Sequence, residues 1–262
     1  MRRAIGFPPW KRQPIIPNTF RVTSQACRHR KNELKPWLKE PWCIPAGPSG
    51  AFVAAMEDVI EVYHRPYGPK RPVVRIDEQP IPLIGETRTP IPAAPGRPAR
   101  YDYEYRRNGT ANLFRVFAPR VGWRHVAVTE RRTAKDFGAF LRYVVDEVYA
   151  AAEKVVLVTD NWNVHAAGSL YEAFDPATAR RRTEKVERHY TPKHGRWLNV
   201  AECEFAVPTR PCLSRRIPTI GELWRRVEAW AKAQNERLVE AKWQFKTADA
   251  RVKLHRLYPS TQ

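Results

Sequence analysis

Hydrophobic and polar positions along the chain follow two different periods, and the changes between them predict the order of helices and strands. Apolar residues recur at helical spacing in three stretches, which predict amphipathic helices over about residues 49–63, 133–151 and 219–239. The second of these stretches begins with the spacing of a capping box, Thr133 followed three residues later by Asp136. A fourth, shorter helix is expected over residues 167–174.

Strand signals lie between these helices. The segment PVVRIDEQ, residues 72–79, predicts a short buried strand that ends in two acids. Residues 109–118 and 123–130 predict a hairpin around a short turn. The segment KVVLVTDN, residues 154–161, has the apolar density of a buried parallel strand, and VERHYTP, residues 186–192, predicts another strand. The order strand, hairpin, helix, strand, helix, strand, helix indicates an α/β protein with a mixed five-stranded sheet.

Proline divides the chain by composition. Of the 24 prolines, 17 lie in residues 1–100, where they remove backbone donors and exclude a regular helix bundle. The first 50 residues also carry ten Lys and Arg against two acids, so we expect an extended basic arm there. With the first helix, this arm makes a region of residues 1–70, and residues 71–262 are expected to form a compact domain. The total of 262 residues is enough for one sizeable core.

The charge of the chain indicates a polyanionic partner. The 46 Lys and Arg exceed the 27 Asp and Glu by 19, and nucleic acid is the first candidate for such a surface. Charge alone does not separate an enzyme that acts on DNA from a protein that only binds it. No apolar run is long enough to cross a membrane, and the first residues lack the apolar region of a secretory signal. The four cysteines have no paired spacing, which favours a reduced, cytoplasmic protein without a zinc site.

Three acids lie where a metal site is expected. Asp77 closes the first strand, Asp160 closes the strand after the long helix, and Glu202 lies in a candidate helix after the last strand. If the first two of these strands are parallel neighbours, both aspartates emerge at the same edge of the sheet. Converging carboxylates repel one another, and hard divalent cations such as Mg²⁺ neutralise them and also bind phosphate oxygens. The alternative is that both aspartates only end strands and stabilise the turns that follow.

Four longer segments carry a family resemblance. They are RIDEQP, GETRTPIPAAPGRPARYDYEYRRNGTANLF, VTDNWNVH and HYTPKHGRWLNVAECEF, in this order along the chain. With them the chain resembles, over about residues 30–260, the DDE transposases of bacterial insertion sequences, in the branch related to mariner-like elements. The resemblance implies a DDE superfamily endonuclease with a ribonuclease H-like fold.

The resemblance also implies a reaction and the residues that perform it. The catalytic and metal-binding acids fall on Asp77, Asp160 and Glu202, and Glu204 is the alternative third acid, two positions further along. The implied cofactor is Mg²⁺ or Mn²⁺, with two ions held by these acids. Water at the site would cleave a phosphodiester at the transposon end, and the freed 3′-hydroxyl would then attack target DNA. The implied partners are DNA and a second copy in a synaptic complex, at the bacterial nucleoid.

Several polar residues near these acids are candidates for supporting roles. Asn161, Asn163 and His165 follow the second aspartate, where they would orient a ligand or contact phosphate; helix capping and turn formation explain them equally well. In the family pattern the third acid follows three residues after the asparagine of the WLN phrase, which is Asn199 here. A basic and aromatic loop before that acid is expected to hold the DNA backbone, with a solvated loop as the alternative. This loop contains Lys193, His194, Arg196 and Trp197.

Two departures from the family pattern suggest the hypothesis of a truncated or decaying copy. No three-helix DNA-recognition module precedes the first strand, although CRHRKNELKPW is similar to the end of such a helix-turn-helix region. Pro208 and Pro211 fall where the helix with the third acid should continue, and an interior proline costs about 3 kcal/mol. Two other functions stay open. One is a basic DNA-binding protein without catalysis, and the other is a different ribonuclease H-like nuclease.

Overall fold

The computed structural model describes residues 45, 47–198, 213, 215–241 and 243–259. Some of the predictions fall outside these residues. They concern the basic arm over residues 1–44, Asn199, Glu202, Glu204, and the helix break at Pro208 and Pro211.

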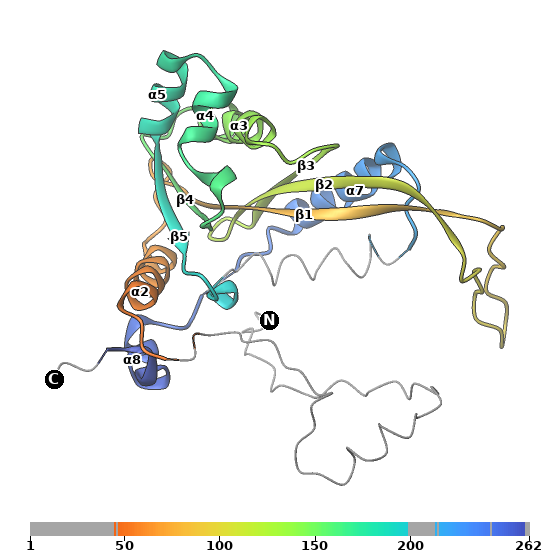
Figure 1. The fold of residues 1–262 in the computed structure, drawn as a ribbon, viewed down its shortest axis with the longest axis horizontal. Coiled ribbons are helices and arrows are strands. Elements are labelled where there is room, and N and C mark those ends of the chain that lie inside the picture. The colour runs from red at the N-terminus through yellow and green to blue at the C-terminus, as the bar shows by residue number, and fades with distance from the viewer. Residues whose placement is uncertain (1–44, 46, 199–212, 214, 242, 260–262) are drawn as a thin grey trace, which may run out of the picture. The chain divides into compact units, whose positions relative to one another are not determined.

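Five strands form one mixed sheet, as the sequence predicts (Figure 1). The order across the sheet is β3-β2-β1-β4-β5. β1 (Val73–Glu86), β2 (Tyr105–Ala118) and β3 (Trp123–Thr129) pair antiparallel, whereas β4 (Val155–Asp160) pairs parallel with both β1 and β5 (Val186–Thr191). Helices lie in the connections between the parallel strands, because a parallel pair needs a long crossover. The predicted hairpin followed by alternating units is confirmed.

β1 and β2 are longer than the sequence predicts, because they continue past the sheet as a two-stranded ribbon. β1 pairs with β4 only from Val73 to Arg75, but with β2 from Arg75 to Glu86. The prediction ended the first strand before Pro80 and Pro82, since proline cannot donate to a ladder. Among the described residues, the ribbon part of β1 pairs only with β2, so its other edge is unpaired and tolerates prolines.

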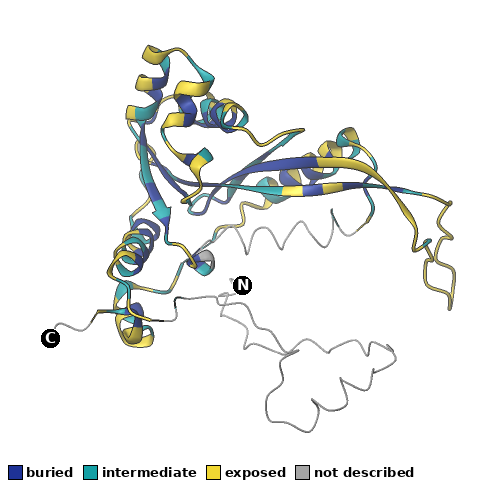
Figure 2. Cartoon of the chain, in the orientation of Figure 1, coloured by how far each residue is buried: buried dark blue, intermediate teal, exposed yellow. Residues whose placement is uncertain are grey.

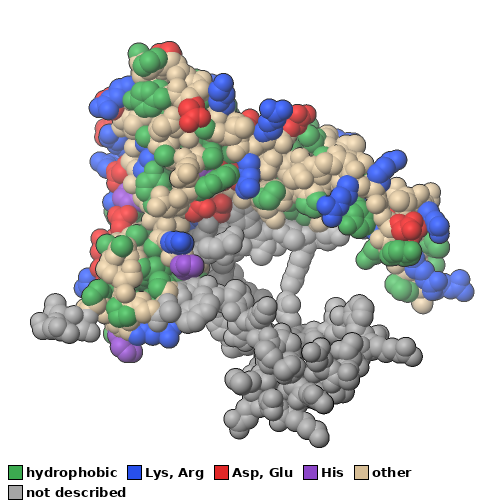
Figure 3. Space-filling view, viewed as in Figure 1, with side chains coloured by type: hydrophobic (Ala, Val, Ile, Leu, Met, Phe, Trp, Pro, Cys, Tyr) green, Lys and Arg blue, Asp and Glu red, His purple; other side chains and the backbone are tan. Residues whose placement is uncertain are grey.

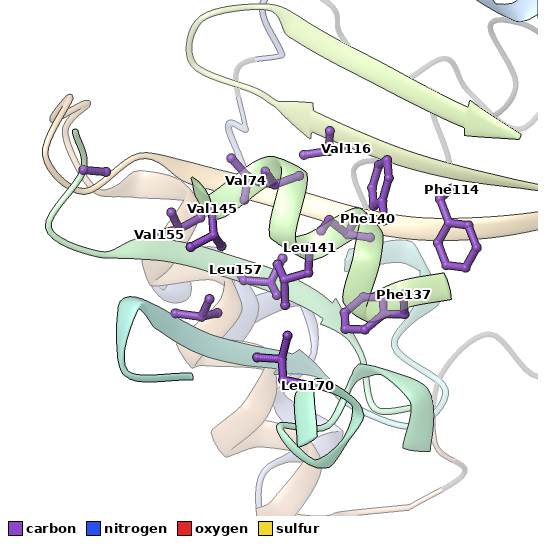
Figure 4. Close-up of a cluster of buried hydrophobic side chains, with 14 of the residues drawn as sticks. Val74, Phe114, Val116, Phe137, Phe140, Leu141, Val145, Val155, Leu157 and Leu170 are labelled. Carbon is purple, nitrogen blue, oxygen red and sulfur yellow. The ribbon is translucent and has the colours of Figure 1, made fainter. Parts of the chain in front are cut away.

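One face of the sheet is covered by α3 (Ala134–Arg142), α4 (Gly168–Ala173) and α5 (Pro176–Lys185). Figure 4 shows the core between them, in which α3 and α4 side chains meet alternate strand residues such as Val74 and Leu157. These positions are fully buried. The apolar run of β4 is thus explained by burial on both faces, which is usual for a parallel strand inside a sheet.

The start of α3 confirms the predicted capping box. The Asp136 N–H donates to the Thr133 hydroxyl, and the Asp136 carboxylate accepts from the Thr133 N–H at 2.8 Å. The α-helix is shorter than predicted because its continuation, Tyr143–Val148, is π-helical.

α5 is absent from the sequence prediction. Asp175 caps this helix by accepting from the Thr178 N–H at 3.0 Å, and Pro176 lies in its first turn. Both are ordinary helix-start signals. The rest of α5 is rich in arginine, and it lacks the apolar stripe on which the prediction depended.

The opposite face of the sheet is covered by α2 (Gly50–His64) and α8 (Thr247–Lys253). α2 begins as predicted, and the Ser49 hydroxyl accepts from the Phe52 N–H at 3.2 Å. Both helices share a buried cluster with strand residues that include Val158. The N-terminal helix therefore belongs to the core of the sheet, although the predicted boundary near residue 70 stays a prediction.

α7 (Ile220–Arg237) lies against β3 and the ribbon, and it buries most of the apolar stripe predicted over residues 219–239. Leu238, also expected in that stripe, follows the helix in a left-handed conformation and is exposed. Leu223, Val227 and Trp230 pack there with apolar residues of the ribbon. Figure 2 shows the ribbon changing from buried positions beside α7 to exposed ones at its far end. Within the described part of the chain, no helix is long and apolar enough to cross a membrane.

The core in Figure 4 predicts a large effect of a single truncation. Leu141→Ala on α3 removes a fully buried side chain, and we expect the free energy of unfolding to fall by about 2–5 kcal/mol. Val252→Ala on α8, where the side chain is 74% exposed, is the control, with an expected change within about 0.5 kcal/mol. Urea denaturation measures both. Equal midpoints for the two variants would contradict the assigned core.

Candidate active site

The strand register brings Asp77 and Asp160 to the same level, just past the end of the parallel pairing between β1 and β4. Asp160 closes β4 as predicted, but Asp77 does not close β1, because this strand continues to Glu86 in the ribbon. The last paired residues of these parallel strands are Arg75 and Val158, and each aspartate lies two positions further along its own strand. Residues two apart share a face of a sheet, so both aspartates belong to the face covered by α2. The parallel pairing on which the sequence prediction depended is confirmed.

A buried arginine stands beside the two aspartates. The Arg75 side chain is fully buried, and its Nη1 donates to the Tyr63 hydroxyl of α2 at 3.2 Å. Its Nη2 lies 3.7 Å from Oδ2 of Asp77, which is the distance of an ion pair. The charge of Arg75 also favours the charged form of the Asp160 carboxyl group, by lowering its pKa.

His165 joins the second aspartate to a further carboxylate. Its ring is fully buried, with Nδ1 at 2.6 Å from Oδ1 of Asp160 and Nε2 at 2.8 Å from Oε1 of Glu78. The Phe137 ring packs against the imidazole, with 5.0 Å between ring centroids. Contacts on three sides fix the ring, and through it one oxygen of Asp160. The Asp160 side chain remains 50% exposed, so its carboxylate is accessible to a ligand.

Burial and charge oppose each other along this chain of groups. Burial alone would lower the pKa of the His165 ring, but the carboxylates of Asp160 and Glu78 outweigh it and raise the pKa to about 10. Burial alone would raise the pKa of Asp160, yet the hydrogen bond from His165 and the charge of Arg75 bring it below its usual value. Burial raises the pKa of Glu78 in spite of His165. At neutral pH His165 is therefore a cation and Asp160 a carboxylate.

Glu78 is the functional candidate that sequence reasoning missed. It follows Asp77 directly, and consecutive strand residues point to opposite faces. Glu78 therefore points into the face covered by α3, where its side chain is only 3% exposed. The available signal was an acid at an inward position of a buried strand, since such a group needs a partner. His165 is that partner.

The remaining predicted residues near the site differ in their surroundings. Asn161 and Asn163 are exposed, and Asn163 begins the 3₁₀ turn that ends at His165. Lys193 and His194 are exposed as well. Trp197 is partly buried in the cluster of α2, with its ring centroid 5.7 Å from that of Phe245. The side chain of Arg196 lies outside the described part.

The donor chemistry of the site fits a hard cation. Asp77, Glu78 and Asp160 are three carboxyl groups, and the cations that neutralise them are Arg75 and His165. The carboxylates of Asp77 and Asp160, at one level on adjacent strands, match Mg²⁺, which takes few carboxylates and completes its shell with water and phosphate oxygens. Within the described residues no group of three His, Cys, Asp or Glu side chains is arranged to hold a metal ion. The third candidate acid lies outside these residues.

A mixed five-stranded sheet with helices on both faces, and with aspartates at one level on the adjacent parallel strands β1 and β4, is a ribonuclease H-like architecture. The predicted fold is thereby confirmed. The profile of the DDE superfamily endonucleases matches residues 72–224, which is more than half of the chain. The chain belongs to this family, as its motifs predicted.

Two solved structures of similar fold are transposase complexes. The Mos1 transposase paired-end complex with the left transposon end is 16% identical over 82% of this chain, with a TM-score of 0.50. The Mos1 strand transfer complex is 15% identical over 82% of this chain, with a TM-score of 0.54. The match spans 65% and 63% of the two Mos1 chains, which is less than two thirds of their length. No sequence among the curated proteins matches the chain.

The charge state of His165 predicts a pH-dependent contribution to stability. Its pKa in the folded chain is raised to about 10, above the unfolded value of about 6.5. The stabilisation is therefore fully present below about pH 6.5 and is lost as the pH rises toward 10. We expect the stability difference between wild type and His165→Gln, measured by urea denaturation in EDTA, to shrink by about 1 kcal/mol per pH unit in that window.

His255→Gln, at an exposed position of the last 3₁₀ turn, is the control. Its stability difference from wild type should stay near zero at every pH. A His165→Gln difference that is constant from pH 6 to pH 10 would show that the ring is neutral in the folded chain.

Proposed function

We propose that the chain is a transposase that cleaves DNA strands at the ends of an insertion sequence and joins them to target DNA, with Mg²⁺ or Mn²⁺ as cofactor. The observation that carries the proposal is the pair Asp77 and Asp160, which lie at one level where the parallel pairing of β1 and β4 ends, in a member of the DDE endonuclease family. The similarity in fold to a transposase bound to a transposon end supports DNA as the partner.

Asp77, Asp160 and Glu202 would hold two metal ions. When bound, these ions supply an activated water and neutralise charge on the scissile phosphate. The chain's own residues hold the ligands in place. Arg75 lies at ion-pair distance from Asp77, and His165 fixes one oxygen of Asp160 while the carboxylate stays half exposed. Phosphoryl transfer asks little covalent chemistry of a protein, so this positioning carries much of the rate.

The third acid is the part of the proposal that rests on the family pattern. Leu198, the last described residue before the gap, is fully buried in the cluster on the face of Asp77 and Asp160. Glu202 follows four positions later, and Glu204 two positions after that. The spacing from Asn199 favours Glu202 over Glu204. Substitution of each glutamate in turn distinguishes the two candidates.

DNA and a second copy of the chain are the proposed partners, at the bacterial nucleoid. Lys193 and His194 are exposed just after β5, and with Arg196 they are proposed to contact the DNA backbone. Trp197 is partly buried, so we propose that it anchors this loop to the core. Asn161 and Asn163 remain candidates for phosphate contacts beside Asp160.

A non-catalytic DNA-binding protein is the main alternative. Pro208 and Pro211, which would break the helix of the third acid, would suit a decaying copy. A different ribonuclease H-like nuclease is the other. The first alternative predicts salt-sensitive DNA binding without Mg²⁺-dependent nicking. The second predicts cleavage of RNA–DNA hybrids or junctions in preference to linear transposon ends.

Loss of either Asp77 or Asp160 should abolish DNA cleavage. We expect Asp77→Asn and Asp160→Asn to lower the rate at least about 10²–10³-fold, because each removes a carboxylate that would hold the metal ions, and these ions would neutralise charge in the transition state. The measurement is Mg²⁺- or Mn²⁺-dependent nicking of a duplex that carries the inverted repeat flanking the gene. Asp175→Asn is the control, because Asp175 caps α5 and asparagine caps equally well.

Glu202→Gln and Glu204→Gln separate the two candidates for the third acid, and only Glu202→Gln should be inactive. If wild type and Asp160→Asn cut equally well, the site assignment is wrong. If wild type binds the duplex without cutting it, the chain is a binding protein. Faster cutting of RNA–DNA hybrids or junctions would identify a different nuclease.

The Glu78–His165 contact should affect the metal requirement of cleavage. Glu78→Gln keeps the shape of the side chain but removes the charge that orients His165 against Asp160. Loss of such an outer contact typically weakens metal affinity 10–100-fold, so half-maximal cleavage should need about that much more Mg²⁺. Glu147→Gln, whose side chain pairs with Arg142 on the surface, is the control. An unchanged Mg²⁺ requirement would assign Glu78 to stability alone.

A further inference from the structure

An arginine stacked on a tryptophan lies beside Asp160, and the proposed chemistry does not use it. The guanidinium of Arg132 lies over the ring of Trp162, 4.7 Å from the ring centroid. Both side chains are exposed, and among the described residues Arg132 has no carboxylate partner. An exposed pair of this kind adds little to the stability of a fold. Its place next to a candidate catalytic carboxylate needs another explanation.

The backbone ties Trp162 to this carboxylate. Trp162 follows Asp160 by two positions, and its N–H donates to Oδ1 of Asp160 at 3.3 Å, as in an Asx turn. The same oxygen lies 2.6 Å from Nδ1 of His165. The indole meets the imidazole of His165 edge-on, with 5.8 Å between ring centroids. The position of the indole is therefore fixed relative to Asp160.

Arg132 reaches the site from the turn between β3 and α3. The Thr129 hydroxyl donates to the Arg131 carbonyl at 2.5 Å, and the Asn112 amide donates to the Glu130 carbonyl at 3.2 Å. The capping box at the start of α3 follows immediately. Hydrogen bonds thus hold the backbone on both sides of Arg132, so its guanidinium extends from a fixed point.

Together the two side chains have the chemistry that binds a nucleotide. A guanidinium that lies flat on a ring keeps the N–H groups of its edge for a phosphate. Aromatic rings stack on bases of any sequence. Trp162 is 36% exposed although Arg132 covers part of it, so ring surface remains for a base.

Positive charge alone does not locate the reacting nucleotide. Figure 3 shows the blue Lys and Arg side chains spread over the visible face of the protein. Arg132 differs from a solitary surface arginine because it is stacked on a ring whose backbone N–H binds Asp160. A strand with its scissile phosphate at Asp160 would have its neighbouring nucleotide within reach of this pair.

We propose that Arg132 and Trp162 form a subsite for the nucleotide next to the scissile phosphate, in which Arg132 binds its phosphate and the Trp162 ring stacks on its base. The inference rests on the proposed function, which places a DNA strand at Asp160. A base stacks on the indole only after it leaves the duplex, and this step is easiest for an unpaired base. Held in this way, the strand would present its scissile phosphate in one orientation for attack.

The first test detects the stacked base without cleavage. A duplex of the inverted repeat and its flank carries 2-aminopurine at one position at a time across their boundary, and the fluorescence of this base changes when it leaves the duplex stack. With wild type in EDTA we expect such a change at a position beside the boundary. Trp162→Ala should lose the change. Trp224→Ala on α7, where the ring is 47% exposed, is the control and should keep it.

The second test measures the rate of Mg²⁺-dependent cleavage at saturating protein concentration. We expect Trp162→Ala and Arg132→Ala to cut at least about tenfold more slowly. Trp162→Phe should regain most of the rate, because it keeps an aromatic ring. Arg132→Lys should regain only part of it, because lysine has the charge without the planar group. Arg256→Ala, at an exposed position of the last 3₁₀ turn, is the control and should cut at the wild-type rate.

Thermal melting of each variant checks that the core is intact, since the substituted side chains are exposed. Wild type without a fluorescence change at any position would overturn the proposal. So would a Trp162→Ala variant that keeps the change but needs more Mg²⁺, because the indole would then only support His165. If wild type shows the change and Trp162→Ala loses it, but no strand is cut, the proposed function fails and the subsite stands.

Discussion

The short parallel pairing of β1 with β4 is the constraint on which the site depends. Only three residue pairs, from Val73–Val156 to Arg75–Val158, hold these strands together, yet they set the level of both Asp77 and Asp160. A shift of the register by one residue would move an aspartate to the opposite face of the sheet. The apolar run of β4 and the helices on both faces hold that register by burying alternate residues on each side.

Charged groups buried beside the site work against this stable core. Arg75, Glu78 and His165 are almost completely buried, and each requires a partner of opposite charge to offset its lost hydration. Apolar residues at the same positions would make a simpler core. What the charges provide is orientation, since His165 contacts Asp160 with one nitrogen and Glu78 with the other. Buried charged groups of this kind, which lower the stability of a core, are expected at functional sites.

Most of the sheet could be predicted from the sequence because each of its strands and most of its helices carry a clear periodic pattern. The exceptions have physical causes. α5 has an arginine-rich exterior in place of an apolar stripe, and the ribbon contains prolines that suggested an early strand end. The level of Asp77 and Asp160 followed from strand order, whereas the Glu78–His165 contact joins residues 87 positions apart and needs the tertiary structure. The family motifs supplied Glu202, which no pattern of burial or spacing identifies by itself.

Asp77 also lies at a boundary of local stability. Before it, β1 is enclosed between β2 and β4, and after it the strand belongs to a ribbon paired on one side. Isolated two-stranded ribbons are marginally stable, and local opening takes place in cooperative units. The exposed part of the ribbon can therefore fray from its tip while the central sheet and the part packed on α7 stay closed. A ligand that contacted both the ribbon and the sheet would suppress that opening, so that part of its binding energy would be spent on ordering the strand that leads to Asp77.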